Sequence, residues 1–324
     1  MIFMGQEKIF RFAIMGAGGI AEKFCDAVNR LENMEVIAVA SKSLDRASRF
    51  AKKNNVAQAY DSYEEMLKDA DPDGVYIATT PNYHFELTML CLDYKKPVLC
   101  EKAMMVNGEE ARLVFQRSKE LGVFVMEGMW SRFLPHNKIA KQWLDEGKIG
   151  NVELAEINIG FQAGNDPKNR FNNPDLAGGA ATDITVYCFE LMTYFLDRPV
   201  KDIHTYMIQS ETGVDKTEQI SILYDNCIAN MHASIAAKLN DEAVFYGTEG
   251  KIVVPLVHYG QECSLYRDRE EPVHFTDQTE NGFIYEIQEM VDCVKRGEVE
   301  SKVTPHEMTI RCATMFDQLM GRKG

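Results

Sequence analysis

The sequence has no long uncharged apolar run and no cysteine pair in C-x-x-C spacing. No apolar stretch approaches the ~18 residues of a membrane-spanning helix. Charged residues interrupt the apolar stretch at the N-terminus (Lys8, Arg11), so we do not expect a signal peptide. Most of the eight cysteines lie inside apolar segments, which predicts free, buried thiols in a reducing cytoplasm. The histidines have no spacing with Cys, Asp or Glu that indicates a metal site, so no metal is predicted.

Positive charge is also scarce, since 35 Lys and Arg stand against 49 Asp and Glu for a net charge of −14. An acidic surface repels phosphodiesters and anionic lipids, so we expect neither nucleic acid nor membrane as a partner. The negative net charge does not exclude a small anionic ligand, because a single pocket can be positively charged on an acidic protein. The 324 residues are 45% hydrophobic and 26% charged, which is typical of a globular chain of about two domains.

The first half alternates short apolar runs with helix start signals. Its candidate strands are almost entirely apolar, as expected for parallel strands covered on both faces: residues 9–15, 34–40, 74–80, 97–100 and 123–126. Between them, Ser62 and Asn107 each precede a Glu at the third position, which indicates a helix N-terminus. The pattern predicts an α/β fold with a doubly wound parallel sheet, a Rossmann domain that binds a dinucleotide, over residues 1–129.

The second half shows strict alternation of apolar and polar residues, beginning at residues 155–162. Similar runs occupy residues 203–210, 218–225, 227–236, 243–254 and 263–275, and helices are predicted at 135–147, 178–196, 283–296 and 305–321. Alternation indicates antiparallel strands with one solvated face. We therefore predict a C-terminal α+β domain over residues 130–324 with a large, mostly antiparallel sheet, whose last helix packs back on the first domain.

A glycine motif separates the first predicted strand from the first predicted helix. Residues 16–21 read GAGGIA and match G-x-G-x-x-G/A in the strand–turn–helix context that the motif requires. Gly16 would make the tight turn, and Gly18 would let the backbone approach a pyrophosphate at the helix N-terminus. The alternative is a tight strand-to-helix turn that binds no ligand.

The end of the second predicted strand lacks an acidic residue. NAD sites place Asp or Glu about 20 residues after the glycine motif, where it bonds the ribose 2′-hydroxyl. Here the strand ends in Ser41, Lys42 and Ser43, two hydroxyls and a cation that suit a 2′-phosphate. We predict NADP as the cofactor, with NAD as the alternative if Lys42 is only a solvated loop lysine.

Three further segments complete a recognisable pattern: TTPNYH at residues 79–84, EK at 101–102 and GGAATDITVY at 178–187. Together with the glycine motif, they resemble the Gfo/Idh/MocA oxidoreductase family, and the resemblance covers the whole chain. Tyr187 stands where the family more often has His. This tyrosine and the segment MEGMWSRF at residues 126–133 resemble the branch of dimeric dihydrodiol dehydrogenases and NADP-dependent D-xylose dehydrogenases.

The chain departs from the family pattern at one position, where Ala103 follows Glu101-Lys102 in place of the usual proline. A cis bond before a residue other than proline costs ~3 kcal/mol. We therefore expect a trans Lys102–Ala103 bond and a somewhat different direction for the lysine side chain.

The resemblance implies three catalytic residues. It places Lys102 beside the substrate, where its ammonium would stabilise developing alkoxide charge. Tyr187 is the predicted general acid/base, aided by the positive charge of Lys102. Asp183 precedes Tyr187 by four residues and would share its helix face; we expect it to bond a substrate hydroxyl or orient the lysine. The alternatives are an ion-paired lysine, a core tyrosine and a carboxylate placed by the helix dipole.

The motifs and the resemblance also give binding candidates. We predict cofactor contacts from Gly16, Gly18, Gly19, Ile20, Ser41, Lys42, Thr79, Pro81, Asn82, His84, Glu101 and Lys102, with a structural histidine as an equal alternative for His84. Substrate contacts are predicted from Arg132 and Arg170, which suit hydroxyls or a carboxylate, and from Trp130 and Phe161 as an apolar wall. Salt-bridged arginines and core aromatics are the alternatives.

These observations predict an NADP-dependent oxidoreductase that acts on a CH–OH group of a sugar, polyol or trans-dihydrodiol. Two alternatives are a redox-neutral NAD-dependent glycoside hydrolase and a dinucleotide-sensing binding protein without catalysis. An uncovered sheet face usually marks an interface. The resemblance agrees, since it implies a homodimer or a dimer of dimers through the C-terminal sheet. The physiological substrate and the favoured direction do not follow from the sequence.

Overall fold

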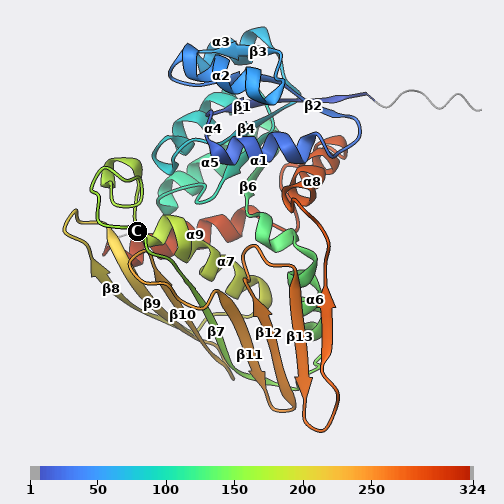
Figure 1. Ribbon diagram of the computed structural model, residues 1–324, viewed down its shortest axis with the longest axis vertical. Coiled ribbons are helices and arrows are strands. Elements are labelled where there is room, and N and C mark those ends of the chain that lie inside the picture. The colour runs from blue at the N-terminus through green and yellow to red at the C-terminus, as the bar shows by residue number, and fades with distance from the viewer. Residues whose placement is uncertain (1–7, 322–324) are drawn as a thin grey trace, which may run out of the picture. The chain divides into compact units, whose positions relative to one another are not determined.

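The computed structural model describes residues 8–321, which form two compact units (Figure 1). The first unit contains the chain up to residue 104 together with residues 110–128 and 283–306. The second unit contains residues 105–109, 129–282 and the chain from residue 307 onward. Among the described residues, no helix is both long and apolar enough to cross a bilayer.

The first unit is built on a six-stranded sheet in the order β3-β2-β1-β4-β5-β6, with every pair parallel. This is the strand order of doubly wound dinucleotide-binding sheets, so the predicted Rossmann fold is confirmed. The short edge strand β3 was not predicted. The strands are β1 Phe10–Met15, β2 Met34–Ala40, β3 Gln58–Tyr60, β4 Gly74–Ile77, β5 Val98–Glu101 and β6 Val125–Gly128.

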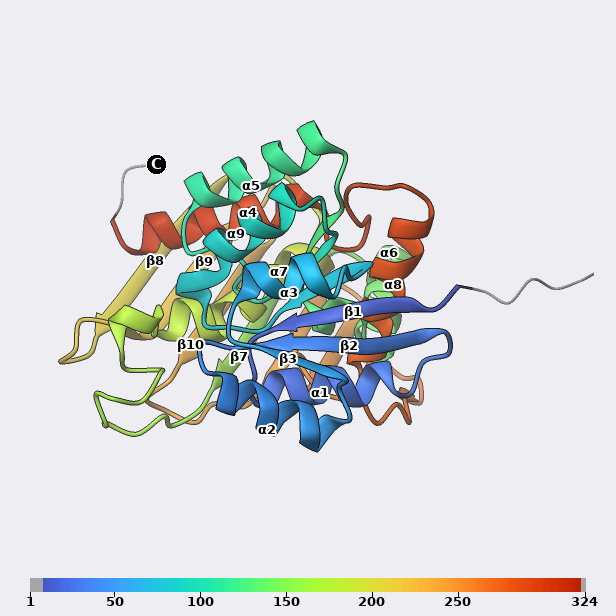
Figure 2. The same cartoon turned by 90° about the horizontal axis from the view of Figure 1, so that it is seen from above.

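Helices cover both faces of this sheet. In Figure 2, α1 and α2 lie on one side of β1–β3 and α3 lies on the other. Ser43 and Ser62 cap α2 and α3 through their side-chain oxygens, and α8 packs against α1. The helices are α1 Gly19–Val28, α2 Leu44–Asn54, α3 Tyr63–Asp69, the 3₁₀ turn η1 Pro81–Tyr83, α4 His84–Asp93, α5 Gly108–Leu121 (which starts in the second unit) and α8 Phe283–Lys295.

The second unit is built on an eight-stranded sheet in the order β14-β13-β12-β11-β7-β10-β9-β8. Its pairs are antiparallel except β7–β10, which confirms the mostly antiparallel sheet. The predicted runs 243–254 and 263–275 each divide into two strands. The strands are β7 Val152–Gly160, β8 Asp202–Gln209, β9 Asp215–Leu223, β10 Ile228–Ser234, β11 Glu242–Gly247, β12 Gly250–Pro255, β13 Glu262–Arg267 and β14 Val273–Thr276.

One face of this sheet packs against α6 and α7 and buries apolar side chains such as Ala155, Ile157 and Met231. The helix predicted over residues 178–196 has two parts, a π-helical segment η4 (Ala181–Thr185) and the α-helix α7 (Val186–Phe195). The other helical elements are η2 Trp130–Phe133, α6 Pro135–Asp145, η3 Pro174–Leu176 and α9 His306–Leu319, which begins at the last residue of the first unit.

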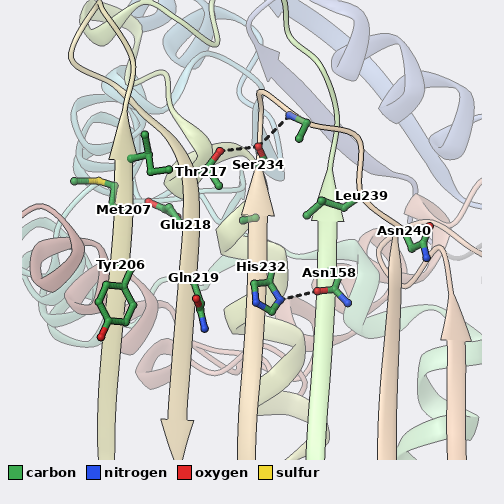
Figure 3. A pocket seen from close by; sticks show the side chains of 13 residues that line it. Asn158, Tyr206, Met207, Thr217, Glu218, Gln219, His232, Ser234, Leu239 and Asn240 are labelled. Atoms are coloured by element: carbon green, nitrogen blue, oxygen red, sulfur yellow. Dashed lines mark hydrogen bonds between the residues drawn. The ribbon is translucent and has the colours of Figure 1, made fainter.

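The opposite face of the sheet carries side chains drawn in Figure 3, among them exposed Tyr206 and Gln219. Asn158, His232, Gln219 and Tyr206 form a row across β7, β10, β9 and β8, and His232 Nδ1 lies 2.8 Å from Asn158 Oδ1. A pocket of about 670 Å³ opens along this row. None of the predicted site residues lines it.

Candidate functional site

The glycine turn after β1 has the geometry of a phosphate site. Gly16 has φ +109, and a Cβ there would lie 2.6 Å from the Ala78 carbonyl oxygen, so a side chain does not fit. Gly18 precedes α1 and provides no side-chain cap for the helix. A Cβ on Gly18 or Gly19 would meet no atom within 4 Å, so open space adjoins the first turn. The helix N-terminus, which continues through half-buried Ile20, therefore fits a pyrophosphate.

The tip of β2 carries the predicted cation and one that was not predicted. Lys42 Nζ lies 3.5 Å from the centroid of the Tyr83 ring and lowers the pKa of that phenol. Arg46 Nε, on the first turn of α2, donates to the carbonyl oxygen of Ala17 within the glycine turn at 3.4 Å. Arg46 lies three residues after the Ser43 helix cap, and this position could have identified it as a cation near the glycine turn. Two cations thus lie around this tip, where Ser41 is buried.

Asp45, the first acidic residue after the tip, is paired with Arg49 at 3.0 Å on the exposed surface of α2. An acidic side chain that would bond a ribose 2′-hydroxyl follows β2 in NAD sites. The sequence supplies none at the tip itself, and the nearest carboxylate already has a cationic partner.

The turn after β4 contains four of the predicted cofactor residues. Thr79 precedes η1, which holds Pro81 and Asn82, and the hydroxyl of Thr80 donates to Asn82 Oδ1 at 2.7 Å. His84 begins α4 and is fully buried. Its ring nitrogens lie 3.0 Å from the Ala103 carbonyl oxygen and 3.1 Å from that of Thr79. His84 therefore joins the turn after β4 to the turn after β5.

Burial lowers the pKa of His84 to about 4, although hydrogen bonds to backbone carbonyls oppose the change. The folded protein then binds fewer protons than the unfolded chain between pH 4 and 6.5, so stability should fall as the pH is lowered through this window. His84→Asn should reduce the difference in unfolding free energy between pH 7 and pH 4.5 by about 2 kcal/mol. Urea unfolding at both pH values measures it, with exposed His274→Asn as the control. An unchanged difference in His84→Asn would contradict the prediction.

Glu101 and Lys102 lie where β5 ends. The Tyr76 hydroxyl donates a short hydrogen bond to the buried Glu101 carboxylate. Burial raises the pKa of Glu101 to about 7, while the Tyr76 hydrogen bond and the charge of Lys102 act in the opposite direction. Lys102 is half-buried. Because β1, β4 and β5 are parallel neighbours, the glycine turn, Thr79 and Lys102 all follow carboxyl ends on one edge of the sheet.

The Lys102–Ala103 peptide bond is cis, so the expectation of a trans bond is wrong. That expectation considered only the intrinsic preference of the bond. In the structure, Ala103 is buried, its carbonyl oxygen contacts the His84 ring, and the Met104 N–H donates to Glu127 at 2.9 Å. Contacts distant in sequence thus hold this turn.

Tyr187 lies near the start of α7 and is 8% exposed. The Trp130 indole Nε1–H donates to its phenolic oxygen at 3.1 Å, and the His258 ring centroid lies 4.9 Å from its own. This hydrogen bond fixes the position of the phenolic oxygen, the atom that would exchange a proton with a substrate. The sequence predicted Trp130 as part of an apolar wall and did not predict its hydrogen bond to Tyr187. It also did not predict the contact between Tyr187 and His258. Both contacts join residues that are far apart in the sequence.

Asp183 lies in the π-helical segment and pairs with Arg170 at 3.0 Å. The Arg170 guanidinium carbon is 3.9 Å from the centroid of the Phe171 ring, which meets Phe161 edge-on at 4.9 Å. Asp183 and Arg170 therefore contact each other directly, and Phe171, which was not predicted, connects Arg170 to Phe161. The assumed i, i+4 relation of Asp183 to Tyr187 spans a π-helical segment and is not that of a regular α-helix.

Arg132 is placed differently from the other predicted substrate residues. Its side chain is 8% exposed, lies 3.9 Å from the buried Glu190 carboxylate and stacks over the Tyr194 ring at 4.8 Å. This arrangement matches the salt-bridged alternative. Within residues 8–321, no group of three or more His, Cys, Asp or Glu could hold a metal ion.

Two family models match the chain. Residues 10–129 match the "Oxidoreductase family, NAD-binding Rossmann fold" model, and residues 138–253 match the "GFO/IDH/MocA C-terminal domain" model. Trans-1,2-dihydrobenzene-1,2-diol dehydrogenase from Mus musculus is 35% identical over 306 residues, covering 91% of each chain. The protein of the same name from Danio rerio is 32% identical and covers 97% of each chain.

Solved structures share the fold at low sequence identity. A 3-ketoreductase from Actinomadura kijaniata, in complex with NADP and TDP-benzene, superposes with a TM-score of 0.87 at 22% identity, covering 96% of this chain and 97% of its own. The aldose-aldose oxidoreductase from Caulobacter crescentus gives 0.88 at 20% identity and 97% of each chain. Neither the hydrolase nor the sensor alternative gains support from these matches. The chain is an oxidoreductase with an NAD(P)-binding Rossmann domain, and it belongs to the Gfo/Idh/MocA family.

Proposed function

We propose that this oxidoreductase uses NADP to oxidise a carbinol, or NADPH to reduce the carbonyl, of a sugar, polyol or trans-dihydrodiol. The observation that carries the proposal lies on one sheet edge of the first unit. There the uncapped N-terminus of α1 follows β1, a cationic tip follows β2, and Lys102 follows β5. Open α/β sheets bind dinucleotides and their reacting partners at this edge.

The chain's own residues would handle the proton and the charge on the reacting oxygen. When bound, the cofactor would supply or accept the hydride. The phenolate of Tyr187 takes the proton of the substrate hydroxyl in oxidation and returns it in reduction. The Lys102 ammonium is the hydrogen-bond donor that stabilises negative charge on a reacting oxygen. Trp130 supports Tyr187 by donating to the phenolic oxygen.

Two features of the second unit support a polyhydroxy substrate that carries a flat ring. The Asp183 carboxylate accepts hydrogen bonds from hydroxyl groups, and its Arg170 partner is 53% exposed and can also donate. Phe161 and Phe171 offer aromatic faces next to this pair. A trans-dihydrodiol combines two hydroxyls with such a ring, and the two dehydrogenases from Mus musculus and Danio rerio carry that class of compound in their names.

Lys42 should determine the preference for NADP. Lys42→Ala should raise the Kd for NADPH about tenfold and leave that for NADH within about twofold, because a charge-assisted contact to a 2′-phosphate is lost. Fluorescence titration of both cofactors measures the two constants, with Lys52→Ala on the exposed face of α2 as the matched control. Tighter binding of NADH than NADPH by the unmodified protein would overturn the assignment.

We also propose a homodimer, alone or within a dimer of dimers, formed by the open sheet faces of two copies. Within residues 8–321, no helix of the same unit covers this face, which exposes Tyr206 (70%) and Ile208 (58%) on β8. Leu223, Ile228 and Tyr246 are exposed on β9, β10 and β11. Exposed apolar groups on an uncovered sheet favour association.

We propose the reducing cytoplasm as the cellular compartment of this protein. The eight free, buried cysteines support this proposal.

Light scattering should give at least twice the chain mass of 36.8 kDa. Ile208→Glu should shift the protein toward the monomer, because it places charge in the proposed interface. Leu113→Glu, at an exposed apolar position on α5, should leave the mass unchanged. A mass of one chain for the unmodified protein would contradict the dimer.

A further inference from the structure

A pair of buried carboxyl groups on β9, Asp215 and Glu218, lies against the helical segment that carries Asp183 and Tyr187. Both side chains are almost fully buried, at 1% and 2% exposure. Burying carboxyl groups is costly unless hydrogen bonds or a shared proton compensate for it. All of these residues belong to the second unit.

Asp215 binds the start of the segment. The Ala181 N–H donates to Asp215 Oδ2 at 2.6 Å. Gly179 has φ +123, and a Cβ there would lie 2.2 Å from Asp215 Oδ1, so the close approach of the carboxylate requires glycine. A carboxylate at a helix N-terminus satisfies backbone N–H groups and interacts favourably with the helix dipole.

Glu218 binds the same segment one turn later. The Thr185 hydroxyl donates a short hydrogen bond to Glu218 Oε2. Burial and the charge of Asp215 raise the pKa of Glu218 well above its usual range, and burial also raises that of Asp215. Two adjacent carboxyl groups in such a site retain a proton between them. The proton belongs on Glu218, since Asp215 accepts from the backbone N–H groups of the helix.

The two contacts bracket Asp183 and end two residues before Tyr187. Asp183 lies between Ala181 and Thr185, and Tyr187 follows Thr185 by two residues. The bracketed stretch is π-helical, a geometry found mostly as single turns and often at functional sites. If Asp215 did not hold the first residues of this segment, the π-helical turn could convert to a regular α-helix. That conversion would rotate Asp183 relative to Tyr187.

We propose that Asp215 and Glu218 are positioning residues for Tyr187 and Asp183, with Asp215 as the charged cap and Glu218 as its neutral, proton-bearing partner. The part that concerns catalysis rests on the proposed function above. A misplacement of about 1 Å in a catalytic group can cost about 100-fold in rate, so a loosened segment should affect kcat strongly.

Tryptophan fluorescence provides a readout that is independent of activity. The sequence contains two tryptophans, Trp130 and Trp143. In a Trp143→Phe background, the emission of Trp130 reports its hydrogen bond to Tyr187, and Tyr187→Phe in that background gives the reference without the bond. The same carboxyl-to-amide change is then made at the two positions.

Asp215→Asn should move the Trp130 emission toward the reference and lower kcat by about tenfold or more, with KM for NADPH within about twofold. Glu218→Gln should leave emission and kcat close to those of the parent, because an amide replaces a neutral acid. Circular dichroism establishes that each variant is folded. If Asp215→Asn does not fold, Thr185→Val carries the test with a smaller shift in the same direction.

Equal effects of the two amide substitutions, or no effect of Asp215→Asn, would overturn the proposal. If Asp215→Asn does not fold and Thr185→Val replaces it, an unchanged Trp130 emission in Thr185→Val would also overturn the proposal. An emission shift in Asp215→Asn alone would support the positioning role even if the parent protein showed no activity with NADPH. In that case the proposed function would fail and the positioning role would stand.

Discussion

Lys102→Ala is expected to lower kcat about 1000-fold while the Kd for NADPH changes by less than about threefold. The ammonium is the cationic donor that we assign to the reacting oxygen, and removing one such donor from an active site costs 100- to 1000-fold in rate (about 2.7–4 kcal/mol). Binding should persist, because the glycine turn after β1 and the cations at the tip of β2 contact other parts of the dinucleotide.

Two further variants sharpen this prediction. Lys102→Arg keeps the charge but changes its geometry, so it should recover only part of the activity. Lys52→Ala, which removes an exposed lysine from α2 of the same unit, should behave like the unmodified enzyme. Steady-state rates at saturating NADPH and fluorescence titration separate catalysis from binding. A Lys102→Ala enzyme that retains full kcat with bound cofactor would remove this residue from catalysis.

Tyr187→Phe is expected to lower kcat about 100- to 1000-fold, because it removes the group that exchanges a proton with the substrate hydroxyl. The aromatic ring and its contact with His258 would remain, so the fold should be preserved. Trp130→Phe keeps the phenol but removes its donor, and it should cost only about 3- to 10-fold, the effect of one hydrogen bond.

Tyr194→Phe is the matched control for Tyr187→Phe, because it removes a hydroxyl from the same helix. Its kcat should equal that of the unmodified enzyme. Equal rates for Tyr187→Phe and Tyr194→Phe, with NADPH bound in both, would show that Tyr187 is a core tyrosine and not the acid/base.

The architecture was largely predictable, because its signals are local. Parallel strands buried on both faces give almost uninterrupted apolar runs, as in β4 and β5, and the glycine turn lies between a strand and a helix. β3 escaped prediction because it has only three residues, one of them exposed Gln58. The run at 243–254 contains two strands, because the turn between β11 and β12 takes only two residues, Thr248 and Glu249, and interrupts the apolar pattern only briefly.

The candidate site was less predictable, because its contacts join distant parts of the chain. Trp130 meets Tyr187 across 57 residues, and Asp215 meets Ala181 across 34. His84 is buried against Ala103, which no periodicity indicates. The π-helical geometry of Ala181–Thr185 and the cis bond at Lys102 likewise have no local signature. The sequence therefore predicted which residues belong to the candidate site, whereas their contact partners could be identified only from the three-dimensional structure.

The most direct test of the central claim is an assay at 340 nm of the unmodified enzyme and Lys102→Ala. Each is incubated with NADP or NAD and a panel of aldoses, inositols and trans-dihydrodiols. We expect at least one substrate to be oxidised with NADP, more slowly with NAD, and not measurably by Lys102→Ala. Binding of NADPH without oxidation of any panel member, together with cleavage of an aryl glycoside, would contradict the account and favour a redox-neutral hydrolase.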